Sequence, residues 1–281
     1  MLFADLSLSR RLEAAEGYAC RQFALARRRL FPESGSEAIH VAGADVVFDG
    51  AASPVTQTFG LGMHENPTPD DLNTIEQFFA SRGAPTQHEV SPFAGIATLE
   101  MLCARGYKPI EISNVLCQTI EANSTTASET ESSPRIRVRV IERAEAALWA
   151  QVNARGWRHE YPELQDFMWD IGTLLVNREN SPCFLAEIDG EPAAAGALAI
   201  YKGTALFAGA STVPEFRRRG LQGALLKARM RYACEQGCDL AMMVAAPGSD
   251  SQRNAQRQGF LIAYTRFKWG KSNQPGTRPA G

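Results

Sequence analysis

Three consecutive arginines followed by two glycines are the part of this sequence best suited to chemistry. Arg217–Arg219 come directly before Gly220, and Gly223 follows three residues later. Guanidinium groups bind phosphate oxygens through charge-assisted hydrogen bonds. Glycine has no side chain, so a phosphate can approach the backbone N–H groups around it. The residue types and their spacing therefore favour a binding site for a diphosphate.

The residues on either side predict how this loop is held. A strand over 205–213 leads into it, and an amphipathic helix begins inside it at Gly220, with Leu221, Leu225 and Tyr232 on one face. The first turn of a helix has unpaired N–H donors and the positive end of the helix dipole, both of which favour a bound anion. The strand, loop and helix together predict an anion site at the start of this helix.

Other parts of the second half alternate short strands and helices. Turn residues at Asp189-Gly190 and Lys202-Gly203 predict antiparallel hairpins, and Gly237 ends the helix that follows the arginine loop. The expected elements are a strand at 135–142, helices at 144–155 and 162–175, strands at 183–188, 193–201 and 205–213, a helix at 220–236, a strand at 240–246, a helix at 249–258 and a strand at 261–269.

The first half repeats this order with little sequence identity. Its expected elements are a helix at 12–30, strands at 46–48 and 55–63, a helix at 70–82, a strand at 86–90, a helix at 93–105 and strands through 107–120. Gly83 ends a helix there as Gly237 does in the second half, and Gly106-Tyr107 corresponds to Gly259-Phe260. We interpret this as an internal duplication. Chance similarity of two α/β segments is the alternative.

A polar segment separates the two halves. Residues 121–134 are rich in Ser and Thr, lack large apolar side chains and end in proline, as linkers do. We therefore predict one domain at 1–120, a linker at 121–134, a second domain at 135–270 and a flexible tail at 271–281. The expected fold class is α/β, of the α+β type, with a mixed, mainly antiparallel sheet flanked by helices in each domain.

Composition and cysteine spacing restrict the function. The 281 residues carry a net charge of −2, which gives no reason to expect nucleic acid or an anionic membrane as partner. No apolar stretch approaches the roughly 20 residues of a membrane helix, and the N-terminus does not have the pattern of a signal peptide, so we expect a cytoplasmic protein. The six cysteines form no CxxC pair, and we expect no metal site.

An ordered set of motifs resembles the GNAT superfamily of acyl-CoA N-acyltransferases. The set runs from Val213-Pro-Glu-Phe216 through the arginine–glycine loop and its helix to Ser251–Phe260, which ends in Gly-Phe. The resemblance covers roughly 135–269 and is strongest over 205–268. The weaker copy at 1–120 implies a tandem arrangement of two such folds, the first one degenerate.

The resemblance implies roles for particular residues toward acetyl-CoA. In that superfamily the arginine–glycine loop binds the CoA diphosphate, and the strand before it pairs with the pantetheine arm. The backbone groups that would pair with pantetheine are those of Ser211, Thr212 and Val213. The residues that would surround the diphosphate are Arg218, Arg219, Gly220, Leu221, Gln222, Gly223 and Ala224. Asn254 would bind the pantetheine or the phosphate side of CoA.

Several positions depart from the superfamily pattern. Gln222 stands where Gly or Ala is usual, although its backbone amide can still bind phosphate. Ala255 stands where a tyrosine often protonates the leaving thiolate, so the general acid would be Ser251 or Tyr264, if there is one. The strand 205–213 has no carboxylate to act as a base, so a water chain or an amine that arrives neutral would replace it.

The corresponding loop of the first half, His64–Asp71, has a different composition. It contains two prolines and three acids but neither arginine nor glycine. Proline removes an N–H donor and an acid repels phosphate. We therefore expect that the first copy does not bind CoA.

The resemblance implies an N-acetyltransferase that moves an acetyl or other short acyl group from acyl-CoA to a primary amine by direct attack in a ternary complex. The amine belongs to a small molecule or a peptide, its identity stays open, and the expected state is a monomer or weak dimer. One alternative is a non-catalytic acyl-CoA-binding or sensing module. A second is transfer from an aminoacyl-tRNA, against which the near-neutral charge and the intact phosphate loop argue.

Overall fold

The computed structural model describes residues 3–121, 135–157 and 165–271. These residues form two compact units. Unit 1 comprises Met1–Cys117 and Val244–Gly281, and unit 2 comprises Gln118–Met243. Apart from Glu121 and Lys271, the predicted linker at 121–134 and tail at 271–281 lie outside the described residues.

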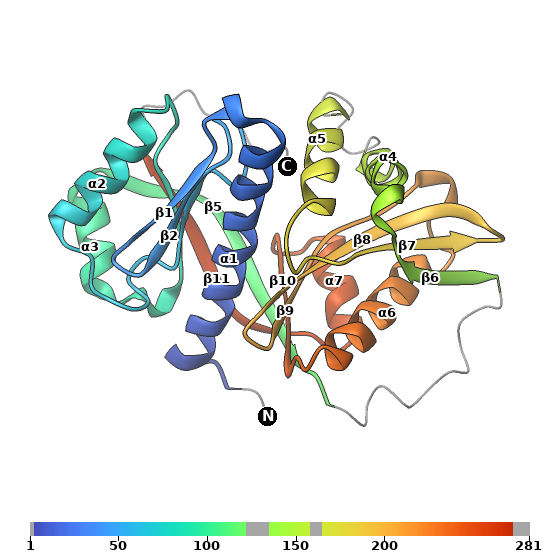
Figure 1. Cartoon of the computed structure of the whole chain (residues 1–281). Helices are drawn as coiled ribbons and strands as arrows, with labels where there is room; N and C mark the ends of the chain where they lie inside the picture. Colours follow the sequence, from blue (N-terminus) through green and yellow to red (C-terminus); the bar gives the residue numbers. More distant parts are fainter. Residues whose placement is uncertain (1–2, 122–134, 158–164, 272–281) are drawn as a thin grey trace. The chain divides into compact units, whose positions relative to one another are not determined.

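Unit 1 contains one sheet and four α-helices among its described residues. In chain order its elements are α1 (Leu6–Leu30), β1 (Glu37–Val41), β2 (Ala44–Phe48), β3 (Gln57–Phe59), α2 (Pro69–Ala80), β4 (Gln87–Val90), α3 (Ile96–Ala104), β5 (Tyr107–Thr119), α7 (Asp250–Arg257) and β11 (Leu261–Lys271). The strand order in this part of the sheet is β1-β2-β3-β4-β11-β5 (Figure 1).

The core of unit 1 follows from the alternation of side chains along its strands. Val46 and Phe48 of β2 belong to one apolar cluster, which includes Leu72 of α2. Val47 points the other way and packs with residues of α1 and β3 in a second cluster. Successive strand residues face opposite sides of a sheet, so a continuous apolar run predicts helices on both faces.

The last described strand completes the sheet of unit 1. β11 pairs antiparallel with β4 on one side and with β5 on the other, over registers such as Phe267 opposite Val90 and Lys271 opposite Tyr107. Residues 244–270 belong to the predicted second domain, whereas in the structure they cluster with unit 1. The physical reason is pairing on both edges of β11, together with a buried ion pair between Arg266 and α1.

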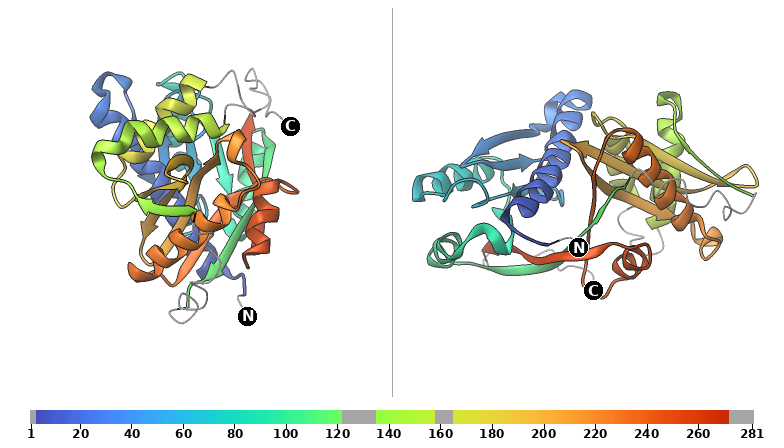
Figure 2. Two further views of the ribbon diagram at one scale, coloured as in Figure 1. Left: turned by 90° about the vertical axis from the view of Figure 1, so that its right-hand side faces the viewer. Right: turned by 90° about the horizontal axis from the view of Figure 1, so that it is seen from below.

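Unit 2 contains the second sheet region. Its elements are β6 (Ile136–Val140), α4 (Ala146–Trp157), α5 (Gln165–Val176), β7 (Cys183–Ile188), β8 (Glu191–Tyr201), β9 (Thr204–Thr212), α6 (Leu221–Glu235) and β10 (Leu240–Ala245). The strand order is β10-β9-β8-β7-β6. Helices α4 and α5 lie over one face of these strands and α6 over the other (Figures 1 and 2).

The two units share one strand pattern. In each, two antiparallel pairs precede one parallel pair: β1-β2-β3-β4 in unit 1 and β7-β8-β9-β10 in unit 2. Each unit is thus a mixed sheet flanked by helices, which confirms the predicted fold class. Among the helices that the structure describes, none is long and apolar enough to span a bilayer.

Candidate functional site

Among the described residues, one edge of β9 is without a neighbouring strand for most of its length. Its parallel pairing with β10 ends where Leu206 lies opposite Met242. From Phe207 to Thr212, the described strands leave β9 paired only with β8, on its other side. A strand edge of this kind can accept an extended ligand as an added strand.

The same part of β9 contains a bulge. Ala208 lies opposite Ala197 of β8, and the next paired residue, Ser211, lies opposite Ala195. Gly209 and Ala210 thus oppose a single residue, and Gly209 has a left-handed backbone with φ +59°. Bulges re-aim backbone and side-chain groups, and they are common beside active sites.

The end of α4 is held against this bulge. The Asn153 side-chain amide donates to the Gly209 carbonyl at 2.7 Å, and the Ser211 hydroxyl donates to the Asn153 carbonyl at 3.0 Å. A Cβ atom on Gly156 would lie 2.4 Å from the Ser211 hydroxyl oxygen, so only glycine permits this approach. Asn153 and Ser211 are buried, so these bonds are shielded from water.

Arg217 connects the arginine loop to the same region. Its Nη2 donates to the Gly156 carbonyl at 2.9 Å, and its Nε donates to the Thr212 carbonyl at 3.3 Å. This guanidinium is therefore a structural bridge between loop, strand and helix. The next two arginines have a different environment.

α6 begins directly after the loop, and no side chain caps its first turn. Its N-cap is Gly220, with φ +86° and no side chain to accept a hydrogen bond, and no acid lies in the first turn. The first N–H groups of a helix have no acceptor within the helix. A Cβ atom on Gly223 would meet no atom within 4 Å apart from its chain neighbours and the adjacent backbone of α6, so the space on this side of the helix is open.

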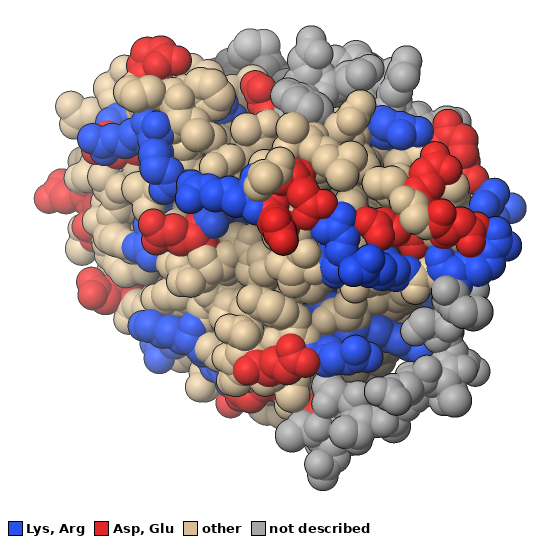
Figure 3. All heavy atoms as spheres, turned by 45° about the vertical axis from the view of Figure 1, so that its right-hand side comes forward, with Lys and Arg blue, Asp and Glu red and all other residues tan. Residues whose placement is uncertain are grey.

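Two arginines come shortly before the start of α6 in the chain. Arg218 and Arg219 are exposed, and neither has an ion pair among the described residues. Arg219 lies 5.3 Å from the centre of the Phe216 ring. The face drawn in Figure 3 carries interspersed basic and acidic groups rather than one sign of charge. A positive loop at an open helix start suits a compact anion such as a diphosphate.

The structure brings most of the predicted cofactor residues together. Ser211 through Ala224 form the continuous end of β9, the loop and the first turn of α6. Two details differ from the expectation. The Val213 N–H donates to the Ala193 carbonyl at 2.9 Å, so this amide is already occupied. The Gln222 side chain donates to the Thr212 hydroxyl at 2.7 Å, which holds the first turn of α6 against β9.

The remaining predicted residues belong to unit 1. Ser251 and Asn254 are exposed on α7. Tyr264 of β11 is buried and donates to a Glu13 carboxylate oxygen at 2.8 Å. Burial and the Glu13 charge raise the pKa of the Tyr264 hydroxyl well above its usual value. This proton is held in an internal bond, which makes Tyr264 a poor general acid.

Sequence reasoning missed several residues that shape the site. Asn153, Gly156 and Gly209 meet where α4 touches the bulge, and Gly196 faces α6 from β8. Gly196 and Gly209 could have indicated this region from the sequence, since a glycine inside a strand often marks a bulge or a close backbone approach. The contacts themselves join residues more than 30 positions apart and have no local pattern.

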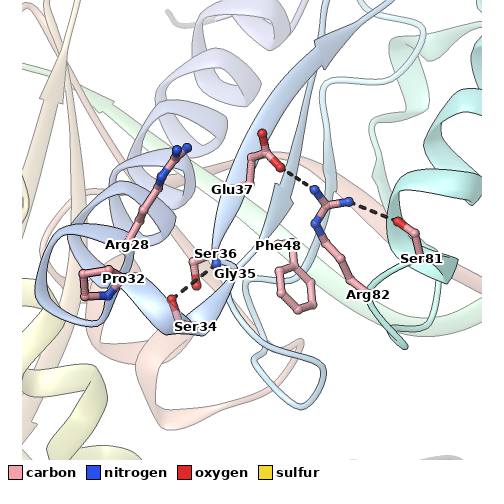
Figure 4. Close-up of a pocket in the computed structure, with 9 residues that line it drawn as sticks. All are labelled: Arg28, Pro32, Ser34, Gly35, Ser36, Glu37, Phe48, Ser81 and Arg82. Atoms are coloured by element: carbon pink, nitrogen blue, oxygen red, sulfur yellow. Dashed lines mark hydrogen bonds and ion pairs between the residues drawn. The ribbon is translucent and has the colours of Figure 1, made fainter.

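Unit 1 contains a separate open pocket of ≈ 590 Å³ near the end of α1 (Figure 4). One side is formed by Arg82, which pairs with Glu37 and lies over the Phe78 ring at 4.0 Å. Arg82 is therefore already neutralised. Among the described residues, no group of three or more His, Cys, Asp or Glu is placed to hold a metal ion.

The second half of the chain is similar to a known family. Residues 144–260 match the family described as Acetyltransferase (GNAT) family. No curated protein matches the chain in sequence.

Solved structures match over nearly the whole chain. A GCN5-related N-acetyltransferase from Kribbella flavida is similar with a TM-score of 0.59 and 19% identity, over 91% of this chain and 96% of that one. A tandem GNAT protein from the clavulanic acid biosynthesis pathway is similar with a TM-score of 0.58 and 13% identity, over 98% of both chains. A conserved protein of unknown function from Staphylococcus epidermidis has a TM-score of 0.56 and 11% identity, over 88% of this chain and 98% of that one. At these identities the likeness concerns the fold alone.

Proposed function

We propose, since residues 144–260 match the acetyltransferase (GNAT) family, that this protein transfers an acetyl or other short acyl group from acyl-CoA to a primary amine. The observation that carries the proposal is the uncapped start of α6 beside Arg218 and Arg219. Both features leave hydrogen-bond donors and positive charge available for a diphosphate.

Different residues of unit 2 would bind the diphosphate and the pantetheine arm of CoA. The N–H groups of Leu221, Gln222 and Gly223, with the two exposed arginines, would hold the diphosphate. The unpaired edge of β9 from Phe207 to Thr212 would hold the extended pantetheine arm.

The reaction is an acyl transfer. The amine nitrogen forms a bond to the thioester carbonyl carbon, the carbon–sulfur bond breaks, and CoA leaves as the thiolate. The amine loses one proton and the thiolate gains one, so the products are an amide and CoA thiol. Since Tyr264 is bonded to Glu13 and position 255 is alanine, a water molecule is left to carry the proton.

The same observations favour a second candidate function. The missing tyrosine at Ala255 and the internal bond of Tyr264 are also what a protein that binds acyl-CoA without turnover would have. A non-catalytic acyl-CoA sensor is therefore the alternative.

Calorimetric titration of acetyl-CoA into the full chain tests the binding step. The test variant is Arg218→Ala with Gly220→Asp, and the matched control is Arg231→Ala, which removes an exposed arginine from α6 beyond its first turn. We expect wild type and control to bind alike and the test variant to lose about 100-fold in affinity, or ~2.7 kcal/mol. Absence of binding to wild type would reject the proposal.

Turnover separates the two candidate functions. A panel of amines is incubated with acetyl-CoA and the released thiol is measured. Thiol release that depends on an amine and is lost in the test variant supports the transferase. Tight binding without release across the panel supports the sensor.

A further inference from the structure

Arg229 is a buried cation in the middle of α6. It is 3% exposed, and no carboxylate pairs with it among the residues that the structure describes. Burial lowers its pKa to about 10, which still leaves it charged at neutral pH. A buried charge without a counter-charge costs stability, so its presence calls for an explanation.

The guanidinium lies under the bulge of β9. Its Nη1 donates to the Ala197 carbonyl at 3.2 Å and to the Ala208 carbonyl at 3.5 Å, the two residues that form the last pair before the bulge. A Cβ atom on Gly196 would lie 3.1 Å from the guanidinium carbon, so this glycine makes room for it. Its third bond, from Nε to Leu225, stays within α6.

Two helices thus hold the bulge from opposite faces of the sheet. Asn153 of α4 bonds the Gly209 carbonyl, and Arg229 of α6 bonds the preceding carbonyl, that of Ala208. Consecutive carbonyls of the bulged strand therefore have different, fixed partners. The open edge of β9 begins in this stretch, directly after Leu206.

Arg229 is remote from the diphosphate loop along the helix. It follows Gly220 by nine residues, which corresponds to about 14 Å at 1.5 Å per residue. The charge is therefore placed to act on the part of an extended ligand that lies along β9, and not on the diphosphate. Electrostatic effects are weakly screened at a buried position.

We propose that Arg229 is a positioning residue for acyl transfer: it fixes the β9 bulge and supplies a buried positive charge that favours negative charge on a thioester oxygen at the open edge of β9. This inference rests on the proposed function. When the amine attacks, the carbonyl oxygen gains negative charge, and fixed positive charge or donors near it lower the barrier. Because no carboxylate among the described residues neutralises Arg229, its positive charge would remain available to the thioester oxygen.

Infrared spectroscopy of bound acetyl-CoA tests this without an amine substrate. Acetyl-CoA labelled with carbon-13 at the thioester carbonyl is added in equal amounts to wild type, Arg229→Met, Arg229→Lys and Arg231→Met. We expect the carbonyl stretch to fall in frequency on binding to wild type and to the Arg231→Met control. It should return toward the free value in Arg229→Met and stay between the two in Arg229→Lys, which keeps the charge but not the planar fork.

Calorimetry on the same samples separates the two proposals. Acetyl-CoA affinity should change less than about threefold in Arg229→Met, because the diphosphate contacts remain. If wild type binds but its carbonyl stretch equals that of Arg229→Met, the role of Arg229 is rejected while the proposed function stands. If wild type does not bind, both fail. Should Arg229→Met not fold, Gly196→Ala displaces the guanidinium and keeps the charge, and we expect a smaller frequency change in the same direction.

Discussion

Helices α2 and α6 hold corresponding places in the two units, and they begin in opposite ways. At α2 the Thr68 side chain accepts from the Asp71 N–H, and the Asp71 carboxylate accepts from the Thr68 N–H at 2.8 Å. Pro69 has no N–H, and Asp70 adds a second acid to the first turn. At α6 there is no cap, no acid and no proline in the first turn. The start of α2 thus has side-chain acceptors for its N–H groups in its own first turn, whereas the start of α6 has no side-chain acceptor.

The buried arginines of the two units, Arg266 and Arg229, show a similar contrast. Arg266 of unit 1 is surrounded by Glu13, Glu16 and Glu89, with nitrogen–oxygen distances of 2.9, 2.6 and 3.2 Å. Arg229 of unit 2 donates to backbone carbonyls and lies 5.1 Å from the centre of the Phe207 ring, and no carboxylate pairs with it among the described residues. The two units thus share a strand order, but the corresponding helices α2 and α6 begin differently, and the buried arginines Arg266 and Arg229 differ in whether carboxylates surround them.

Replacing the buried Arg266 of unit 1 should have the largest effect on stability. Arg266→Met leaves the surrounding carboxylates buried without their partner, and we expect a loss of about 3–5 kcal/mol in the free energy of unfolding, measured with urea. Arg135→Met is the control, because it breaks an exposed ion pair with Asp189 and should change stability little. Equal losses in the two variants would contradict the central role of Arg266.

Making α6 resemble α2 should abolish ligand binding. Gly223→Asp places a carboxylate at the helix position that Asp71 occupies in α2. We expect acetyl-CoA affinity to fall about 100-fold by calorimetry, or ~2.7 kcal/mol. Stability should stay equal or rise by about 0.3–1 kcal/mol, because an acid complements the helix dipole.

Gly223→Asn is the matched control for that change, since it adds the same volume without charge. It should retain affinity within a few-fold. A loss as large as that of the aspartate variant would mean that bulk, not charge, excludes the ligand.

The carboxylates around Arg266 should make unit 1 sensitive to pH. Burial, with the charges of Glu13 and Glu89, raises the pKa of Glu16 from 4.5 to about 7 against the lowering effect of Arg266. The folded state then holds this proton more tightly than the unfolded chain. The stabilisation is complete below about pH 4.5 and is lost as the pH rises through about 7.

Glu16→Gln measures this contribution. Relative to wild type, the variant should gain on the order of 1–2 kcal/mol between pH 5.5 and pH 8 in urea unfolding. Glu33→Gln, an exposed carboxylate before β1, is the control. A difference between variant and wild type that is the same at both pH values would show that Glu16 is ionised throughout.

The smallest expected effect concerns the cap of α2. Thr68→Ala removes the side-chain acceptor at the N-cap and should cost about 1 kcal/mol of stability. Acetyl-CoA affinity should not change, since we place the ligand in unit 2. Thr74→Ala, further along the same helix, controls for the loss of a threonine. A drop in affinity for Thr68→Ala alone would give unit 1 a part in binding.

Much of the local structure was predictable because its causes are local. Asp189-Gly190 and Lys202-Gly203 each have two positive φ values in the structure, as tight hairpin turns require, and they connect β7, β8 and β9 as expected. The strand, arginine loop and helix around Gly220 also follow from residue type. β1 was missed, since its turn at Ala42-Gly43 puts positive φ on an alanine, which is uncommon.

The rest depends on contacts between distant segments. Nothing near Arg266 in the sequence indicates that its partner is Glu13, 253 residues earlier. The same holds for the contact between Asn153 and Gly209, or between Arg229 and Ala208. The residues that we propose to bind CoA could therefore be named from the sequence, whereas those that hold β9 in shape could not.

The position of β11 has a consequence for how the protein is made. A ribosome synthesises the chain from its N-terminus, and domains generally fold in that order. The sheet of unit 1 lacks its strand between β4 and β5 until residues 261–271 have been synthesised. Most strands of unit 1 therefore emerge from the ribosome first. β4 and β5 cannot pair with β11 until unit 2 has been translated. The first half of the gene encodes a domain that is completed last.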